Sequence, residues 1–491
     1  MSGLKEKTIS GMLWSAVERF GYTFIMFLSN LFLARLLSPN DFGLIGMIMV
    51  FVAIASIIVD GGFTSALIQK RTINDEDYST AFHVNIILAI ILYVVLYFSA
   101  PSVANFYSIP LLADLLRVLG SILIINALSV VQIAKIKREL NFKYLGIVSI
   151  VSSLVGCCVG VACAFCSFGV WSLVIQSLTT SMTKSVILFI STSWKPSWVF
   201  SKRALKAQFN FGSMVLLSNL VDTVYSNGIS LIIGKSFSSK TLGLYTQART
   251  LESVPNQTLT VIVGQVVFPV FSSVQDNVQK LLTGLRKTIR CLVWINFPLM
   301  ILLIFIADPL FQVLYTEKWM EAVPLFQIAC CGGIMLSSIQ LNNTILLAQG
   351  CSKLYFFSRL LKQSVGFVLI LLAAYIGNLW LLMVIGVAIV PYLFFFISVA
   401  YTKQVIPQYG FRKQISDILD ILVLSLLCGG GSYCLYYCIP PLEPFVQLCV
   451  KTFMYSSLYL ILSKYFIVEE FQIYLNEARR ICIRLKKIFA L

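Results

Sequence analysis

The stretch TAFHVNIILAIILYVVLYFSAPSVA, residues 80–104, contains no aspartate, glutamate, lysine or arginine. A helix that crosses a membrane needs about 20 mainly apolar residues, and within lipid it must satisfy its own backbone hydrogen bonds. Residues 80–104 therefore predict a membrane-spanning helix. The rest of the 491-residue chain has the same character, because 58% of its residues are hydrophobic and 12% are charged. Soluble domains carry roughly 25% charged residues, so the composition excludes a water-soluble globular protein.

Similar apolar stretches recur along the whole chain, and we count about fourteen of them. Their ranges are 11–35, 42–68, 80–104, 112–134, 144–166, 170–191, 209–233, 242–270, 287–306, 323–347, 355–376, 379–401, 418–438 and 445–466. The eighth range is the most polar, because Gln247, Arg249 and Glu252 fall in its first half. This pattern predicts an all-α polytopic membrane protein with about 14 transmembrane helices.

The basic residues fall almost entirely on one side of these predicted spans. About 28 of them, Lys362 included, lie in segments that would face the cytoplasm, and about 3 (Lys235, Lys240 and Lys318) lie on the other side. Cytoplasmic loops of membrane proteins carry such an excess of basic residues. Orientation in the membrane, with both termini in the cytoplasm, therefore explains the net charge of +16 without a nucleic-acid partner.

The loops and the reactive side chains are not those of an enzyme. No loop between spans exceeds about 20 residues, which leaves no room for a nucleotide-binding or soluble catalytic domain. The one histidine, His83, has no visible partner for metal or acid–base catalysis. The 13 cysteines lack the spacing of a zinc site or a disulfide framework. We therefore expect a transporter without catalytic residues, bound metal or organic cofactor.

A short motif occurs twice in the chain. The segment RLLSPNDFGL, residues 35–44, recurs as KSFSSKTLGL, residues 235–244. Each copy follows an odd-numbered predicted span of its half, so the two halves have the same orientation. Parallel repeats of this kind are related by a pseudo-two-fold axis along the membrane normal. We expect a six-helix lobe in 1–208, a second in 209–403, two further transmembrane helices in 404–466 and a basic amphipathic cytoplasmic tail in 467–491.

Several motifs resemble those of a known family. They are ARLLSPNDFGL at 34–44, DGGFTSALIQK at 60–70, GLYTQAR at 243–249, Pro255, and FPVFS at 268–272. With these motifs the chain resembles the polysaccharide (Wzx-type) flippases of the multidrug/oligosaccharidyl-lipid/polysaccharide exporter (MOP) superfamily. The resemblance implies a bacterial inner-membrane protein that moves undecaprenyl-diphosphate-linked oligosaccharides from the cytoplasmic to the periplasmic leaflet by alternating access. It also implies a role in lipopolysaccharide, exopolysaccharide or capsule biosynthesis, next to membrane lipids and glycan polymerase or assembly proteins.

Charged residues inside predicted spans are candidates for a polar cavity, since each costs roughly 2.5–3.5 kcal/mol at the centre of a membrane helix. Arg19 and Arg249 are the cations that we expect to line the cavity and to bind the diphosphate that the resemblance implies. Glu18, Asp222 and Glu252 are carboxylates that either bind H+ or Na+ as a coupling ion or form ion pairs. Arg249 and Glu252 share one helix face, whereas Glu18 and Arg19 point to different sides. For all of them the alternative is a structural ion pair or a side chain that reaches the membrane surface.

Three other functions remain open at this point. An ion-coupled multidrug or cation antiporter of the same superfamily should have a more acidic cavity. A membrane-embedded glycan polymerase or ligase should carry a large outer loop with candidate catalytic residues, and the sequence has no such loop. A scaffold for a glycan-assembly complex would tolerate neutral residues at Arg19 and Arg249, whereas a flippase should not.

Overall fold

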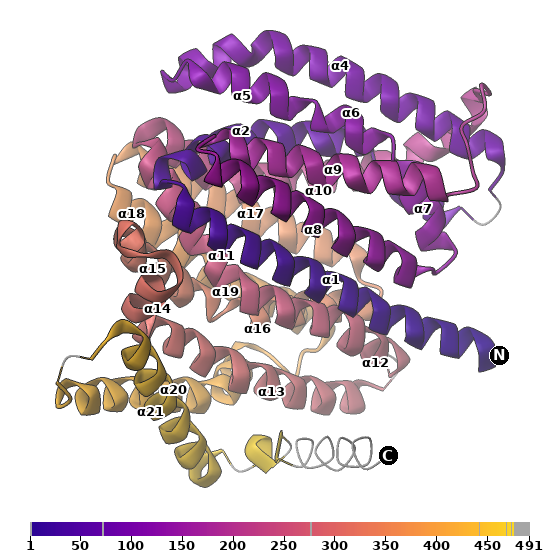
Figure 1. Cartoon of the computed structure of the whole chain (residues 1–491). Coiled ribbons are helices and arrows are strands. Elements are labelled where there is room, and N and C mark those ends of the chain that lie inside the picture. The colour runs from indigo at the N-terminus through magenta and orange to yellow at the C-terminus, as the bar shows by residue number, and fades with distance from the viewer. Residues whose placement is uncertain are drawn as a thin grey trace, which may run out of the picture. The chain divides into compact units, whose positions relative to one another are not determined.

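The computed structural model describes residues 2–70, 73–274, 277–440, 442–467, 469–472 and 474–475. Within these ranges the regular secondary structure is helical throughout (Figure 1), which confirms the predicted all-α membrane fold. The chain divides into two compact units, Met1–Gln247 and Ala248–Leu491.

The first unit is built from long helices connected by short turns. Its described helices are α1 (Ser2–Leu36), α2 (Pro39–Asp60), α3 (Phe63–Gln69), α4 (Asp75–Tyr107), α5 (Leu111–Gly120), α6 (Ile122–Ala127), α7 (Val130–Arg138), α8 (Phe142–Phe165), α9 (Trp171–Ser191) and α10 (Lys202–Ser236). Helix α8 packs along α1 and α9, and α4 packs on α5 and α6 (Figure 1). Helix α10 packs on α2, α3 and α4. Helix α11 (Ser239–Ile262) leads from this unit into the second.

The two copies of the repeated motif begin their helices in the same way. Ser38 caps α2, because the Asp41 N–H donates to Ser38 Oγ (3.4 Å) and the Ser38 N–H donates to Asp41 Oδ2 (2.9 Å). Ser238 precedes α11, and the Thr241 N–H donates to Ser238 Oγ (3.0 Å). The first N–H groups of a helix have no partner within the helix, so a serine oxygen at this position stabilises the helix start.

The glycines of the two copies allow these helix starts to pack directly on each other. A Cβ atom at Gly43 would lie 1.7 Å from the carbonyl oxygen of Ser239, and one at Gly243 would lie 1.8 Å from that of Pro39. In the same contact, Ser239 Oγ donates a hydrogen bond to Asn40 Oδ1. The approach is possible because neither position carries a side chain.

The second unit has more helix interruptions than the first. Its described elements are α12 (Phe268–Ser273), α13 (Val278–Phe305), α14 (Ala307–Tyr315), α15 (Val323–Gly333), α16 (Leu336–Ala348), α17 (Ser352–Tyr375), α18 (Leu379–Met383), α19 (Val390–Val405), α20 (Phe411–Tyr437) and α21 (Pro444–Phe466), with the π-helical η1 (Val263–Val267) and η3 (Val384–Ile389) and the 3-10 helix η2 (Glu317–Ala322). Helix α13 packs on α15, α16 and α20, and α21 packs on α14 and α20.

The described residues contain 12 helical stretches that are long and apolar enough to cross a membrane. They are Pro39–Gln69, Asp75–Tyr107, Leu111–Arg138, Phe142–Phe165, Trp171–Ser191, Val215–Ser236, Val278–Phe305, Glu317–Ala348, Ser352–Tyr375, Leu379–Val405, Phe411–Tyr437 and Pro444–Phe466. The count of about fourteen is therefore not confirmed. The two predicted spans outside this set, 11–35 and 242–270, fall on α1 and on α11 to α12, which are helical but more polar.

The predicted lobes and the predicted tail stay predictions. The boundary between the two compact units follows Gln247, and α10 packs on α2, α3 and α4 of the first unit. In the predicted tail, the structure describes residues up to 475, and residues 476–491 lie outside the described ranges.

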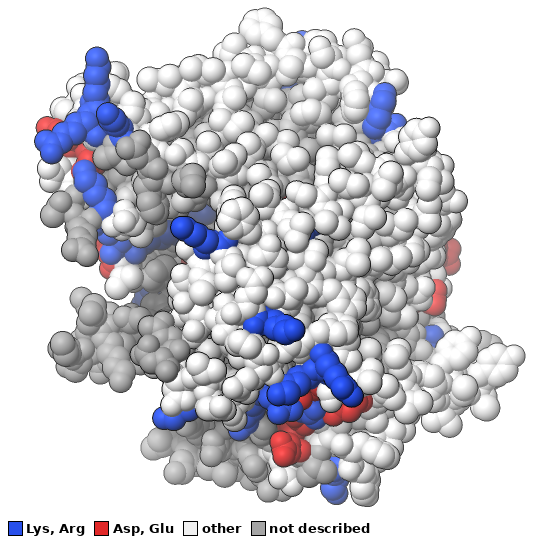
Figure 2. Space-filling model, turned by 180° about the vertical axis from the view of Figure 1, so that it is seen from behind, with Lys and Arg blue, Asp and Glu red and all other residues white. Residues whose placement is uncertain are grey.

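Much of the protein surface is apolar, as a surface in contact with lipid must be. On α4 the side chains of Val95 and Phe98 are 54% and 75% exposed. On the face shown in Figure 2, most of the surface carries no charge, and the lysine and arginine side chains gather in a few groups with acidic side chains near some of them. The free energy of such an apolar surface is lower in contact with hydrocarbon than in contact with water.

Candidate functional site

Arg249 and Glu252 form an ion pair on α11, as their spacing predicts. Arg249 Nη1 lies 2.9 Å from Glu252 Oε2. The two partners differ in exposure, because the Glu252 side chain is 1% exposed and the Arg249 side chain is 39% exposed. Burying the Glu252 carboxylate without a cation beside it would cost free energy of folding, so the ion pair with Arg249 is favoured. The ion pair holds the guanidinium group at a fixed place on the helix.

The carboxylate of Glu252 is also bonded and covered on its other side. Asn256 Nδ2 donates to Glu252 Oε1 over 2.6 Å, one helical turn further along α11. Gly333, the last residue of α15, packs on this pair so closely that a Cβ atom there would lie 2.4 Å from Glu252 Oε1. The absence of a side chain at Gly333 therefore lets α15 close over Glu252.

Glu18 and Arg19 have different surroundings, as predicted from their adjacent positions on α1. Glu18 Oε1 accepts a hydrogen bond from Ser149 Oγ of α8 (3.1 Å), and Gly146 of α8 packs on its Cβ atom. Arg19 is exposed on the surface of α1. Glu18 thus contributes to packing between α1 and α8, and a role of Arg19 in a cavity stays a prediction.

Asp222 is half-buried on α10, in the first unit, together with Glu18 and Arg19. Arg249 and Glu252 belong to the second unit. Among the predicted site residues, the described structure brings Arg249 and Glu252 together in an ion pair.

Sequence reasoning placed Lys362 among the cytoplasmic charges, but the structure buries it within α17. Its side chain donates to Asn343 Oδ1 (2.8 Å) and to Ser398 Oγ of α19 (3.1 Å), and the residue is 4% exposed. Long lysine side chains near a span end resemble loop lysines in sequence. The partners of Lys362 are 19 and 36 positions away in the chain, so the sequence carries no local signal of this buried site.

A cluster of ion pairs lies at the start of α20, where it meets α13. Arg286 binds Asp417 through two hydrogen bonds of 2.6 and 2.8 Å. Arg290 binds Asp420 (2.8 Å) and Glu470, which lies beyond α21. These contacts link α20 and the segment after α21 to α13. Sequence reasoning missed them because the partners are about 130 and 180 positions apart.

The phenol of Tyr409 completes this cluster from the turn before α20. Tyr409 OH donates to Asp417 Oδ2 over 2.9 Å, and the residue is fully buried. Burial and the neighbouring Asp417 carboxylate raise the pKa of Tyr409 well above its ordinary value. The phenol therefore keeps its proton, and its hydrogen bond to Asp417, throughout the physiological pH range.

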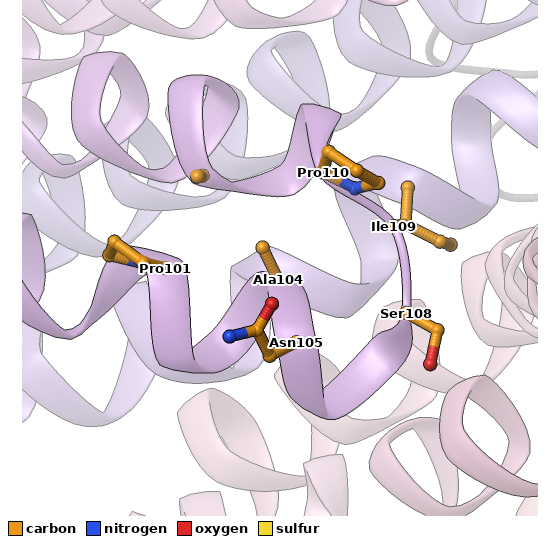
Figure 3. Close-up of a pocket in the computed structure, with 7 residues that line it drawn as sticks. Pro101, Ala104, Asn105, Ser108, Ile109 and Pro110 are labelled. Atoms are coloured by element: carbon orange, nitrogen blue, oxygen red, sulfur yellow. The ribbon is translucent and has the colours of Figure 1, made fainter.

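A cavity of about 450 Å³ lies where α4 ends and α5 begins (Figure 3). It is lined by Pro101, Ala104, Asn105, Ser108, Ile109, Pro110 and Ala113. A second cavity, of about 270 Å³, lies between α13 and α21 and is lined mainly by apolar and aromatic side chains. Neither lining contains a charged side chain, so neither cavity has the cation that a diphosphate group requires.

Within the described ranges, no three side chains of histidine, cysteine, aspartate or glutamate come together as ligands of a metal ion. The charged groups described above belong mainly to ion pairs. They can bind an anion, or bind and release a proton.

Comparison with known proteins identifies the family. Residues 32–324 match the polysaccharide biosynthesis protein family, which is more than half of the chain. The chain therefore belongs to this family. The teichuronic acid biosynthesis protein TuaB of Bacillus subtilis (strain 168) is 26% identical over 359 residues, which cover 73% of this chain and 74% of that protein. The lipopolysaccharide biosynthesis protein WzxC of Escherichia coli (strain K12) is 24% identical over 352 residues, 70% of this chain and 71% of that protein.

Solved structures show the same fold. The lipid II flippase MurJ, in an inward closed conformation, matches with a TM-score of 0.74 and 14% identity over 93% of this chain and 100% of that chain. An inward-facing multidrug resistance MATE transporter of the MOP superfamily matches with a TM-score of 0.61 and 15% identity, over 82% of this chain and 98% of that chain. The predicted resemblance to Wzx-type proteins is confirmed. The fold is that of these multi-pass helical membrane proteins.

Proposed function

We propose that the protein flips polyprenyl-diphosphate-linked oligosaccharide repeat units from the cytoplasmic to the periplasmic leaflet of a bacterial inner membrane. Two six-helix lobes, 1–208 and 209–403, alternate in access to the two sides, and the polyprenyl tail stays in lipid. Both chain termini lie in the cytoplasm. The flipped units enter lipopolysaccharide, exopolysaccharide or capsule biosynthesis, with glycan polymerase or assembly proteins as partners, and the flippase itself makes and breaks no covalent bond.

The observation that carries this proposal is the half-exposed Arg249 held by a buried carboxylate. A sugar diphosphate cannot cross hydrocarbon unaided, because its charges and hydroxyl groups would lose their hydration. A guanidinium group offers several N–H donors in one plane and binds two phosphate oxygens at once. Since Glu252 fixes one side of the guanidinium group, Arg249 is positioned in advance for an anionic head group. Arg19 is the second cation of the proposed cavity.

The direct test is flipping by the purified protein in proteoliposomes. A short-chain polyprenyl-diphosphate oligosaccharide is added to one leaflet, and sugar that appears on the other leaflet is measured with an impermeant glycosidase. Hydrogen bonds to charged groups contribute about 1.5–3 kcal/mol, so Arg249→Ala should slow flipping roughly 10- to 100-fold.

Arg117→Ala is the matched control for Arg249→Ala. Arg117 also pairs with a carboxylate three residues away, Asp114 (3.5 Å), and it is 33% exposed. Its substitution should leave the flipping rate unchanged. If the folded wild-type protein moves no lipid-linked sugar but exports a cationic dye, the antiporter function replaces this proposal.

H+ and Na+ are the candidate coupling ions, and no other cofactor is proposed. The carboxylates that we consider for this role are Glu252, Asp222 and Glu18. The same proteoliposomes with an imposed pH gradient or an imposed Na+ gradient distinguish the two ions, since the coupling ion's gradient alone should change the flipping rate.

A further inference from the structure

The connection between α9 and α10 is fastened to the first turns of α4. Ser197 Oγ lies 2.8 Å from Ser79 Oγ, and the Ser197 N–H donates to the same oxygen over 3.2 Å. The indole of Trp194 is buried against Tyr78 and Phe82, with ring centroids 5.8 and 6.1 Å apart. These contacts give the connection a defined conformation on the surface of the first unit.

The first turns of α10 stay at the level of the same part of α4. The Ser201 N–H donates to Thr80 Oγ1 (3.0 Å), and Gln208 Nε2 donates to the carbonyl oxygen of Asp77 (3.0 Å). Asp77 and Thr80 are less than one helical turn apart, whereas Ser201 to Gln208 covers about 10 Å of helix. Both ends of this stretch of α10 therefore lie beside the start of α4. The candidate membrane span within α10 begins only at Val215.

The outer face of this stretch carries three cations. Lys202, Arg203 and Lys206 are exposed. Among the described residues none of the three forms an ion pair, although Asp75 and Glu76 at the start of α4 are exposed as well. The first turn of α10 contains no acidic residue, and cations are unfavourable near the positive end of a helix dipole. Negative charge outside the chain would relieve this repulsion.

The backbone of this helix start is not the group that would bind an anion. Ser201 Oγ already accepts a hydrogen bond from the Ala204 N–H (3.3 Å), and so caps the helix. Ala204 is buried against the protein. An anion at this surface would therefore be bound by the three exposed side chains.

Large apolar side chains are exposed directly beside the cations. Trp198 is 97% exposed, and Val199 and Phe200 next to it are exposed too. The ring of Trp198 stacks on His83 of α4 with centroids 5.5 Å apart, so it is held in place although its surface is open. Phe209, which follows the basic stretch, is also exposed. Apolar side chains grouped in this way are unfavourable in water and mark a surface that contacts another molecule or a membrane.

The levels of the two groups match the layers of a membrane surface. Trp198 lies beside His83, in the part of α4 that lacks aspartate, glutamate, lysine and arginine, whereas the basic stretch is bonded to Thr80 and Asp77. About 9 Å of helix separates Asp77 from His83. Aromatic side chains favour the boundary between head groups and hydrocarbon, and basic side chains favour the phosphates outside it. The charge pattern predicts that this end of α4 faces the cytoplasm.

We propose that this surface, which we call the basic–aromatic surface, binds anionic phospholipid head groups of the cytoplasmic leaflet. Its members are Trp198, Val199, Phe200, Lys202, Arg203, Lys206 and Phe209. The apolar members contact the hydrocarbon boundary, and the cations contact the lipid phosphates. A phospholipid uses both halves of the surface, whereas a free phosphate ion would use the cations alone. The proposal goes beyond the flippase function and does not depend on what the protein transports.

The test is quenching of tryptophan fluorescence by phospholipids that are brominated in their acyl chains. The full chain is placed in phosphatidylcholine nanodiscs that contain either brominated phosphatidylglycerol or brominated phosphatidylcholine. Subtracting the signal of Trp198→Phe isolates the quenching of Trp198 from that of the other tryptophans. Brominated phosphatidylglycerol should quench Trp198 at an about fivefold lower mole fraction, because a single cation near an anionic lipid surface strengthens binding by about that factor.

The triple variant Lys202→Gln, Arg203→Gln and Lys206→Gln should lose this preference and keep its quenching by brominated phosphatidylcholine. The matched control removes the same charge from three exposed lysines of the second unit, Lys280, Lys287 and Lys403. It should keep the preference. In 1 M NaCl the Debye length is about 3 Å, so the preference of the wild type should fall there as well.

Equal quenching by the two brominated lipids in the wild type, or an unchanged preference in the triple variant, would overturn the inference. A control variant that loses the preference equally would assign it to the net charge of the protein, which also overturns the inference. A site for free phosphate would lose the preference in inorganic phosphate but not in NaCl of the same ionic strength, and that result would overturn it too. All substituted side chains are exposed, so thermal unfolding of the variants should match that of the wild type.

Discussion

The reciprocal contact of Gly43 and Gly243 gives the sharpest prediction about stability. A methyl group at Gly43 would lie 1.7 Å from a backbone oxygen that cannot rotate away, whereas ordinary contacts begin at 3.4 Å. The starts of α2 and α11 would therefore have to separate by about 1.7 Å. Overpacking of this kind costs about 1–3 kcal/mol, and the hydrogen bond between Ser239 and Asn40 contributes about 1 kcal/mol more.

We therefore expect Gly43→Ala and Gly243→Ala each to lower the free energy of unfolding by about 2–4 kcal/mol. The double variant should lose less than the sum of the two, because one separation of the helices relieves both clashes. Thermal unfolding in detergent, followed by tryptophan fluorescence, measures the three values. Gly430→Ala on α20 is the control, since no heavy atom lies within 4 Å of a Cβ there, and it should be neutral or stabilising by up to about 1 kcal/mol. Single variants as stable as the wild type, or a fully additive double variant, would refute this account of the contact.

Three further predictions concern charged and hydrogen-bonded groups of the second unit. Asp417→Asn should destabilise the protein by about 2–3 kcal/mol in thermal unfolding, because Asp417 is buried and its ion pair is lost. The cost stays below that of a fully buried pair, since Arg286 is half-exposed and keeps part of its hydration. An unchanged unfolding midpoint would show that the pair contributes nothing. Tyr409→Phe should cost about 1 kcal/mol. The folded-state pKa of Tyr409 is raised, so its contribution to the free energy of unfolding is fully present below its unfolded pKa and is lost only as the pH rises through the folded pKa. The stability difference between Tyr409→Phe and the wild type should therefore stay constant from about pH 7 to about pH 10. A stability difference that falls within this range would contradict the assignment. Arg249→Lys should keep the charge but lose the two-point contact with the diphosphate, so its flipping rate should lie between those of the wild type and Arg249→Ala, and a rate as low as that of Arg249→Ala would show that charge alone does not sustain binding.

Helices and their membrane character follow from the sequence because both depend on local composition. Residues 80–104 became part of α4, a candidate span, as their run of apolar side chains predicts. The predicted spans 11–35 and 242–270 are not among the 12 candidate spans of the described residues, and the helices on which they fall, α1 and α11, carry charged residues. The polarity of 242–270 was visible in the sequence, and in the structure that segment holds the ion pair of Arg249 and Glu252.

The spacing of three residues predicted that Arg249 and Glu252 share a helix face, but not that Glu252 is buried. That burial depends on Gly333, which lies about 80 residues further along the chain and reaches Glu252 only through tertiary packing. The contacts of Lys362 with Asn343 and Ser398 depend in the same way on how α16, α17 and α19 pack. Apolar periodicity determines which segments are helices, and it does not determine which polar residues from distant helices meet.

The central claim is that Arg249 binds the diphosphate of a lipid-linked sugar during flipping, and head-group selectivity tests it most directly. The measurement compares two lipids in the same proteoliposomes, an oligosaccharide on polyprenyl diphosphate and the same oligosaccharide joined to the polyprenyl chain without phosphate. We expect the wild type to flip the diphosphate lipid at least about tenfold faster than the neutral one, and Arg249→Ala to lose this preference. Equal rates for the two lipids in the wild type, or an unchanged preference in Arg249→Ala, would contradict the claim.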